Sequence, residues 1–257
     1  MTNNLISKIK SFFSLSFALA KAEFKLRNEG SYLGIFWYLL APLLTFALLL
    51  GIFSTRLGRN IPYYPVYLLL GIILFNFFQY VTTESTRAIR LHRGVIKSIK
   101  FDLETIVGST TLKALFSHIF EIIVFTVFLL IFNVSLKGLL FYPLILFVFL
   151  IFLFGVSLIL TSLTVYFTDL ENILVFASRL LWFATPIFYA IAGQDKLFVL
   201  NLLNPLYYFI TISRDIMIYN QTPEFWLIGG MLTFSLASLL FGILIFNKLK
   251  TKIAELI

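Results

Sequence analysis

The sequence predicts an all-α polytopic membrane protein, and three observations support this fold class. Of its 257 residues, 60% are hydrophobic and only 12% are charged, about half of the ~25% typical of soluble domains. Six stretches are each apolar over the ~20 residues that a helix needs to cross a bilayer. Basic residues are distributed unevenly between the connecting segments. The composition excludes a water-soluble fold and a disordered chain, and the absence of cysteine excludes a disulfide scaffold.

The six stretches predict six transmembrane helices within one domain, residues 1–257. They cannot be strands of a membrane barrel, because such strands alternate apolar and polar residues, whereas residues 144–154 are apolar at both parities. The predicted transmembrane helices cover residues 33–55, 64–86, 110–134, 139–167, 173–192 and 225–246.

The lysines and arginines predict that both termini lie in the cytoplasm. With that orientation the cytoplasmic segments hold thirteen basic residues and the outer loops hold five, in agreement with the enrichment of basic residues in cytoplasmic loops. The same asymmetry accounts for the net charge of +8 without nucleic-acid binding.

The first thirty residues admit two interpretations. Lys8 and Lys10, followed by the stretch 11–20 that ends in Ala-Leu-Ala, resemble a cleavable signal peptide. However, serines interrupt the apolar stretch, and apolar residues recur at spacings of three and four from Leu5 to Phe24, which marks one face of a helix. We therefore predict an amphipathic helix over residues 1–30 that lies in the headgroup plane.

Residues 196–218 are apolar but interrupted by Asn204, Pro205, Arg214 and other polar groups. Such groups make a seventh span unfavourable. The pattern predicts two short helices, residues 197–203 and 206–218, that form a re-entrant or interfacial hairpin on the outer side, between the fifth and sixth spans. Irregular backbone there must pack on protein or line water.

The cytoplasmic stretch 88–105 combines apolar residues with a set of cations, Arg90, Arg93, Lys97 and Lys100. One interpretation is an ordinary basic loop on anionic headgroups. The other is a short helix whose apolar side docks into a soluble partner. The sequence alone does not separate them.

Several kinds of chemistry are excluded by missing motifs. The chain has no phosphate-binding loop of the G-x-x-x-x-G-K-[ST] type, so it cannot bind ATP in that way. His118 and Glu121 lack the His-Glu-x-x-His spacing of a zinc site, and no Gly-x-Ser-x-Gly nucleophile turn occurs. We expect no catalytic residue, no metal and no cofactor in this chain.

Charged and aromatic residues inside or beside the spans are candidates for a substrate path. A charge in lipid is costly and therefore a functional suspect. Arg179 either forms a helix–helix ion pair, reaches the inner headgroups, or meets an anionic group such as a diphosphate. Trp37, Tyr38, Trp182 and Tyr189 either belong to interfacial aromatic belts or stack on sugar rings.

Four segments carry motifs of a known family, in order and spacing. Leu33-Gly34, Trp37 and Pro42 follow a Leu-Gly-x-x-Trp-x-x-x-x-Pro pattern, and the segment 166–169 is similar to an aromatic-Arg-Asp junction, with Thr168 in place of Arg. The segments 185–189, Thr-Pro-Ile-Phe-Tyr, and 204–206, Asn-Pro-Leu, followed by Arg214, complete the set. Together they resemble the ABC-2 permeases that export O-antigen, teichoic acid and capsule polysaccharides, in which the last two segments belong to the end of the fifth span and to the outer hairpin.

This resemblance implies a homodimer in the bacterial cytoplasmic membrane that binds two copies of a cytoplasmic ABC ATPase, which would hold the ATP and Mg²⁺. The substrate would be a polyprenyl-diphosphate-linked glycan. Residues 88–105 would contain the coupling helix, 196–218 the extracytoplasmic gate helices, and Leu33–Gly34 would lie near the cytoplasmic entrance for the substrate. Export of a small lipid or drug, and an intramembrane lipid-modifying enzyme, are the competing functions.

Overall fold

The computed structural model describes residues 2–29, 34, 36–98, 102–167, 169–191 and 194–256, and these residues form helices and connections without a strand. The order along the chain is α1 (Thr2–Asn28), α2 (Phe36–Phe53), α3 (Tyr64–Leu91), α4 (Arg93–Ser98), α5 (Glu104–Ile131), the 3₁₀ helix η1 (Leu136–Phe141), α6 (Tyr142–Thr164), α7 (Leu170–Ala184), α8 (Asp195–Leu202), α9 (Pro205–Met217) and α10 (Phe225–Leu256).

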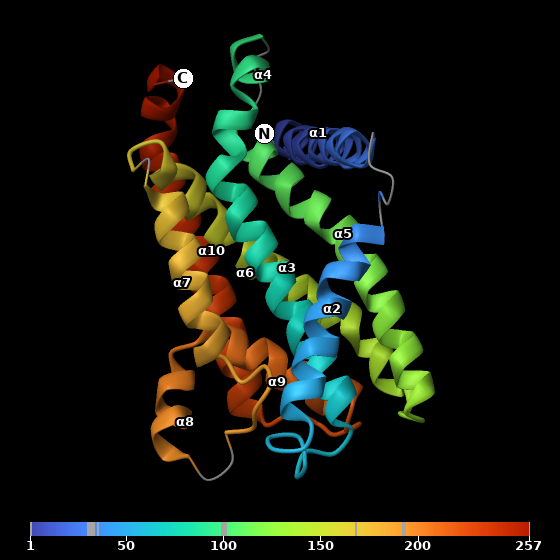
Figure 1. The fold of residues 1–257 in the computed structure, drawn as a ribbon. Coiled ribbons are helices and arrows are strands. Elements are labelled where there is room, and N and C mark those ends of the chain that lie inside the picture. Colours follow the sequence, from blue (N-terminus) through green and yellow to red (C-terminus); the bar gives the residue numbers. More distant parts are fainter. Residues whose placement is uncertain are drawn as a thin grey trace.

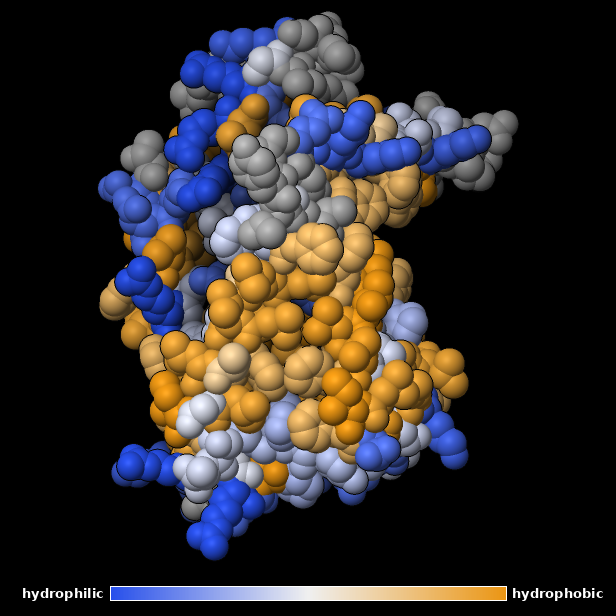
Figure 2. Space-filling view, turned by 45° about the vertical axis from the view of Figure 1, so that its right-hand side comes forward, coloured by the Kyte–Doolittle hydropathy of each residue, from blue (hydrophilic) through white to orange (hydrophobic). Residues whose placement is uncertain are grey.

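The long helices α3, α5, α6 and α10 form a bundle, with α2 and α7 alongside it (Figure 1). α1 lies across one end of the bundle, and α4 and the last turns of α10 lie at the same end. α8 and α9 lie at the opposite end. We call these the terminal end and the hairpin end. Hydrophobic side chains form a broad band between hydrophilic ends (Figure 2).

Four helical segments are long and apolar enough to cross a membrane: Tyr64–Leu91, Glu104–Ile131, Leu136–Thr164 and Phe225–Lys250. The other two predicted spans correspond to shorter apolar helices. α2 contributes Leu39–Phe53, and α7 has 15 residues. Because a helix rises 1.5 Å per residue, each of these two is shorter than the ~30 Å of hydrocarbon.

α7 ends at Ala184, before the end of the predicted helix over residues 173–192. Its C-cap residue Thr185 is extended, because a following proline disfavours helical backbone in the preceding residue. Residues 185–191 therefore leave the helix and expose backbone carbonyls. Likewise, residues 88–105 do not form one continuous helix: α3 continues to Leu91, α4 covers Arg93–Ser98, and α5 begins at Glu104.

α9 begins where the sequence places a turn. The Asn204 side-chain oxygen accepts a hydrogen bond from Leu206 N at 3.1 Å, and Pro205 occupies the first turn. Asparagine at the N-cap and proline just after it are the residues that best start a helix. This local chemistry fixes the point at which the hairpin turns from α8 into α9.

α1 packs on α5 through one of its faces. Ser16 and Ala20 are fully buried, and Ser16 Oγ donates to Thr105 O at 3.3 Å. Gly108 makes this approach possible, since a Cβ there would lie 2.6 Å from Ser16 Oγ. A second apolar row on α1, which contains Ile9, Phe13 and Phe17, stays exposed. One part of the predicted amphipathic helix therefore packs on α5, and the row of Ile9, Phe13 and Phe17 faces the surroundings.

α6 and α10 approach each other most closely at two glycines. A Cβ on Gly155 would lie 2.4 Å from Leu239 N, and one on Gly242 would lie 2.5 Å from Gly155 O. Small residues at such a crossing allow helix backbones to touch, as is typical of helix packing in membranes.

Candidate functional site

The hairpin end contains a fully buried arginine that joins three parts of the chain. Arg214 on α9 is 3% exposed, and its guanidinium donates to Pro186 O at 2.6 Å, Ile187 O at 2.8 Å and Tyr67 O at 3.1 Å. It also lies over the Tyr67 ring, 3.3 Å from the ring centre. Arg214 therefore satisfies the carbonyls that α7 leaves unpaired where it ends.

Other side chains bind the same extended segment. Tyr64 and Tyr67 on α3 donate their hydroxyls to Phe188 O at 2.9 Å and Tyr189 O at 2.8 Å. Asn204 Nδ2 donates to Thr185 Oγ1 at 2.8 Å. Segments 185–189 and 204–206 and Arg214, separate in sequence, thus meet in one hydrogen-bonded cluster.

Gly71 gives Arg214 its room. A Cβ at this position of α3 would lie 2.7 Å from Arg214 Nη2 and 3.2 Å from Ile187 O. The absence of a side chain on α3 is therefore what allows the guanidinium to reach the carbonyls.

The terminal end contains a buried ionic cluster that fastens α1 to α3 and α5. Lys113 Nζ on α5 lies 2.8 Å from Glu23 Oε2 on α1 and 2.7 Å from Glu84 Oε2 on α3. Its side chain is 8% exposed, and each carboxylate is 19% exposed. Glu23 also accepts from His92 Nε2 at 2.7 Å. We call Glu23, Glu84, His92 and Lys113 the ionic cluster.

The surroundings of His92 favour its protonated form. Its Nδ1 faces Ala88 O at 2.7 Å and its Nε2 faces the Glu23 carboxylate, and only the imidazolium donates from both nitrogens. The hydrogen bond to Glu23 accordingly raises the pKa of His92. Burial raises the pKa of Glu23, but hydrogen bonds from His92 and Lys113 outweigh it and lower that pKa overall.

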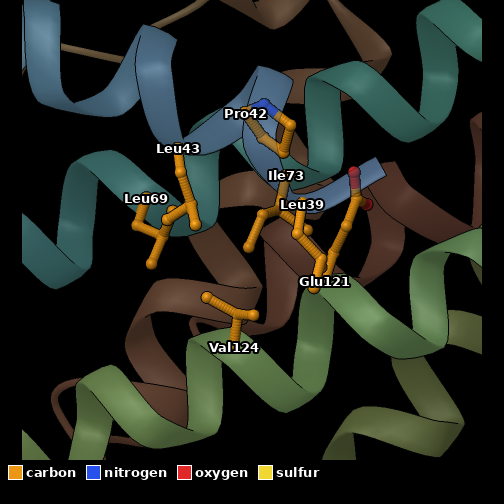
Figure 3. Close-up of a pocket in the computed structure, with 7 residues that line it drawn as sticks. All are labelled: Leu39, Pro42, Leu43, Leu69, Ile73, Glu121 and Val124. Atoms are coloured by element: carbon orange, nitrogen blue, oxygen red, sulfur yellow. The ribbon is translucent and has the colours of Figure 1, made fainter. Parts of the chain in front are cut away.

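A cavity of about 210 Å³ lies between α1, α2, α3 and α5. Its polar lining consists of Arg27, Trp37, Asn76, Tyr80, Ser117, His118 and Glu121. His118 Nδ1 lies 3.0 Å from Glu121 Oε2, and its Nε2 contacts the Tyr142 hydroxyl. A second cavity of about 10 Å³ adjoins Glu121, whose side chain extends from α5 along Leu39 toward α2 (Figure 3).

The predicted substrate-path residues that the structure describes lie in several different surroundings. Gly34 has a positive φ of 43°, and Trp37, 51% exposed, lines the larger cavity. Arg179 is exposed on α7. Trp182 packs edge-on against Phe75, with 4.8 Å between ring centres, and Tyr189 donates to Ala184 O at 2.9 Å. Leu33 lies outside the described residues, as does the side chain of Tyr38.

The predicted coupling residues that the structure describes, Arg90, Arg93 and Lys97, lie at the terminal end. Arg90 Nη2 binds Glu171 Oε2 at 3.0 Å, and Arg87 Nε binds Glu171 Oε1 at 2.7 Å, so this region of α3 is joined to the start of α7. Arg93 and Lys97 are exposed on α4. Lys100 lies outside the described residues.

The sequence analysis missed the ionic cluster and the environment of Arg214. Glu23 and Lys113 are 90 positions apart, so no local pattern indicates their pairing. A usable indication was Lys113 itself, a charge inside an apolar stretch that needs a partner. Arg214 was predicted in the outer hairpin, but nothing local shows that it is buried against carbonyls.

The long apolar helices define a membrane-protein fold. A sequence profile of the ABC-2 type transporter family matches residues 14–218, so the chain belongs to this family. It is 30% identical over 248 residues to the O-antigen export system permease protein RfbA of Klebsiella pneumoniae, which covers 95% of both chains.

Two further relatives match over most of their length. A protein of the same name from Myxococcus xanthus is 23% identical over 86% of both chains. The polysialic acid transport protein KpsM of Escherichia coli is 25% identical over 90% of this chain and 91% of that protein.

Proposed function

We propose that this chain is the permease subunit of an ATP-driven exporter that moves a polyprenyl-diphosphate-linked polysaccharide, of the O-antigen type, across the bacterial cytoplasmic membrane. The observation that carries the proposal is the nearly full-length similarity to two O-antigen export permeases and a polysialic acid transport protein. Capsule or teichoic acid export would use the same subunit architecture with another glycan.

In this proposal α2, α3, α5, α6, α7 and α10 are the six spans, and the terminal end faces the cytoplasm. The distribution of basic residues supports this orientation. The short helices α2 and α7 require local thinning of the bilayer or polar ends that reach the headgroups. α1 then lies in the inner interface, with the exposed row of Ile9, Phe13 and Phe17 toward lipid. α8 and α9 form the outer hairpin.

The driving energy would come from a separate cytoplasmic ATPase, because the sequence has no phosphate-binding loop of its own. Two copies of the chain and two ATPase subunits would assemble, and a hydrophilic glycan would pass through a protein-lined path between the permeases. ATP binding by the partner would shift the population between two packings of the dimer.

Deletion of the gene tests the substrate. The surface glycan is expected to be lost, and lipid-linked glycan is expected to accumulate on the cytoplasmic side, because the polymer cannot cross hydrocarbon without a permease. Immunoblots of surface glycan and radiolabelled lipid extracts measure both quantities. Complementation with the intact gene is the control, and a deletion strain with unchanged surface glycan would contradict the proposal.

Charge reversal on α4 tests the coupling region. An Arg93→Glu, Lys97→Glu variant is expected to retain much less of the candidate ATPase in a pull-down, because both side chains are exposed at the proposed cytoplasmic end. The matched control is Arg56→Glu, Arg59→Glu, which reverses two exposed cations in the proposed outer loop. Equal retention by the two variants would show that α4 does not hold the partner.

A further inference from the structure

A separate cavity of about 160 Å³ lies at the hairpin end, between α3, α9 and the segment that follows α7. Three tyrosines, Tyr67, Tyr207 and Tyr219, form much of its wall, together with Thr211, Arg214 and Asp215. The volume is below the ~300–1,000 Å³ of pockets for drug-sized ligands, and it suits a single small ring.

Asp215 is the unexplained group in this cavity. Its side chain is partly buried, and among the described residues its carboxylate has no hydrogen bond or ion pair to another side chain. Burial, followed by repulsion from Glu224, raises the pKa of Asp215 to about 6, so the group is still ionised at pH 7. A partly buried carboxylate without a side-chain partner can accept hydrogen bonds from a molecule that enters the cavity.

The neighbouring arginine does not neutralise Asp215 by contact. Its guanidinium donates to the carbonyls of Pro186, Ile187 and Tyr67. The Nε of Arg214 is buried and has no partner among the described residues. The cavity thus combines a carboxylate that has no side-chain partner among the described residues with aromatic walls.

We propose that this cavity is a binding subsite for one neutral sugar residue of the exported glycan, with Asp215 accepting hydrogen bonds from sugar hydroxyls. The inference rests on the proposed function and narrows its substrate class. A sugar hydroxyl donates a hydrogen bond, so a sugar ring complements the acceptor that Asp215 offers. Hydrogen bonds to an ionised acceptor are stronger than those between neutral groups. The tyrosine rings offer apolar surface to the C–H face of the sugar.

The charges favour a neutral sugar over an acidic one. Burial and, after it, the negative charge of Glu224 raise the pKa of Asp215, whereas the guanidinium of Arg214 donates to three carbonyls. A sugar carboxylate placed here would meet like charge, which costs binding free energy and discriminates against that partner.

The test uses the purified full-length chain in lipid nanodiscs and saturation-transfer NMR. The neutral probes are the methyl glycosides of glucose, galactose, mannose, rhamnose and N-acetylglucosamine, and the acidic probe is the methyl glycoside of N-acetylneuraminic acid. At least one neutral glycoside is expected to bind, and the acidic one is not. Asp215→Asn is expected to weaken that binding about fivefold, because a charge-assisted hydrogen bond becomes a neutral one.

Asp195→Asn, the same change at an exposed residue of α8, is the matched control and should bind like wild type. Thr211→Phe fills the cavity without altering Asp215 and should abolish binding. Asp215→Asn is nearly isosteric and is expected to keep the elution volume and the thermal midpoint of the wild type. Weaker binding by this variant then reflects the changed acceptor group and not unfolding.

No binding of any neutral glycoside, unchanged binding by Asp215→Asn, or preferential binding of the acidic glycoside would overturn the subsite. The deletion strain reports separately on the proposed function. Binding that depends on Asp215 in a protein whose deletion leaves surface glycan intact would keep the subsite and remove the export role.

Discussion

An Arg214→Met variant is expected to lose about 3–5 kcal/mol of folding free energy, since each hydrogen bond from a charged donor contributes roughly 1.5–3 kcal/mol and three are removed with incomplete additivity. The carbonyls of Pro186, Ile187 and Tyr67 would remain buried without their donor. Loss of the buried charge itself offsets part of this. The measurement is the thermal midpoint of the detergent-purified protein, which should fall by about 10 °C for a chain of this size.

Two variants make the result specific. Arg179→Met removes an exposed arginine and should leave the midpoint nearly unchanged. Arg214→Lys keeps the charge but not the planar fork that reaches three carbonyls, so it should lie close to Arg214→Met. If Arg214→Met melts like Arg179→Met, the guanidinium does not hold α9 to the end of α7.

A Lys113→Met variant is expected to lose a similar amount, about 3–5 kcal/mol, which is the usual loss when one partner is removed from a buried ion pair. Glu23 and Glu84 would then face each other without the ammonium that lies within 2.8 Å of both. α1 should detach from α5. Because the chain has no cysteine, a single Ser16→Cys substitution on the buried face of α1 would report this through its rate of maleimide labelling.

The control for this prediction is Lys25→Met. Lys25 pairs with Glu29 on the surface, where the two side chains are 79% and 55% exposed, and an exposed pair at this spacing contributes about 0.3–0.5 kcal/mol. Glu23→Gln combined with Lys113→Met should lose less than the sum of the single changes, since both remove the same contact. Equal labelling rates for Lys113→Met and Lys25→Met would contradict the role of the ionic cluster.

The apolar runs predicted the all-helical membrane fold because hydrocarbon selects for length and composition, which are local properties. The sequence also predicts the turn at Asn204-Pro205, because helix capping there depends only on neighbouring residues. The apolar runs did not predict that α7 ends at Ala184. The residues around Pro186 are mostly apolar, and their hydropathy is the same whether they lie in lipid or in a packed loop. The partners of Arg214 and Lys113 lie far away in sequence, so only the fold brings them together.

α10 has 32 residues and no proline, so at 1.5 Å per residue it is about 48 Å long. It exceeds the ~30 Å hydrocarbon thickness, and Lys250 near its end lies 3.2 Å from Glu104 on α5. α10 is unbroken, packs closely on α6 at Gly242, and has its one pair of adjacent glycines, Gly229 and Gly230, near its start. A displacement of the end of α10 near Leu256 would therefore be transmitted along the helix toward its other end, near Phe225.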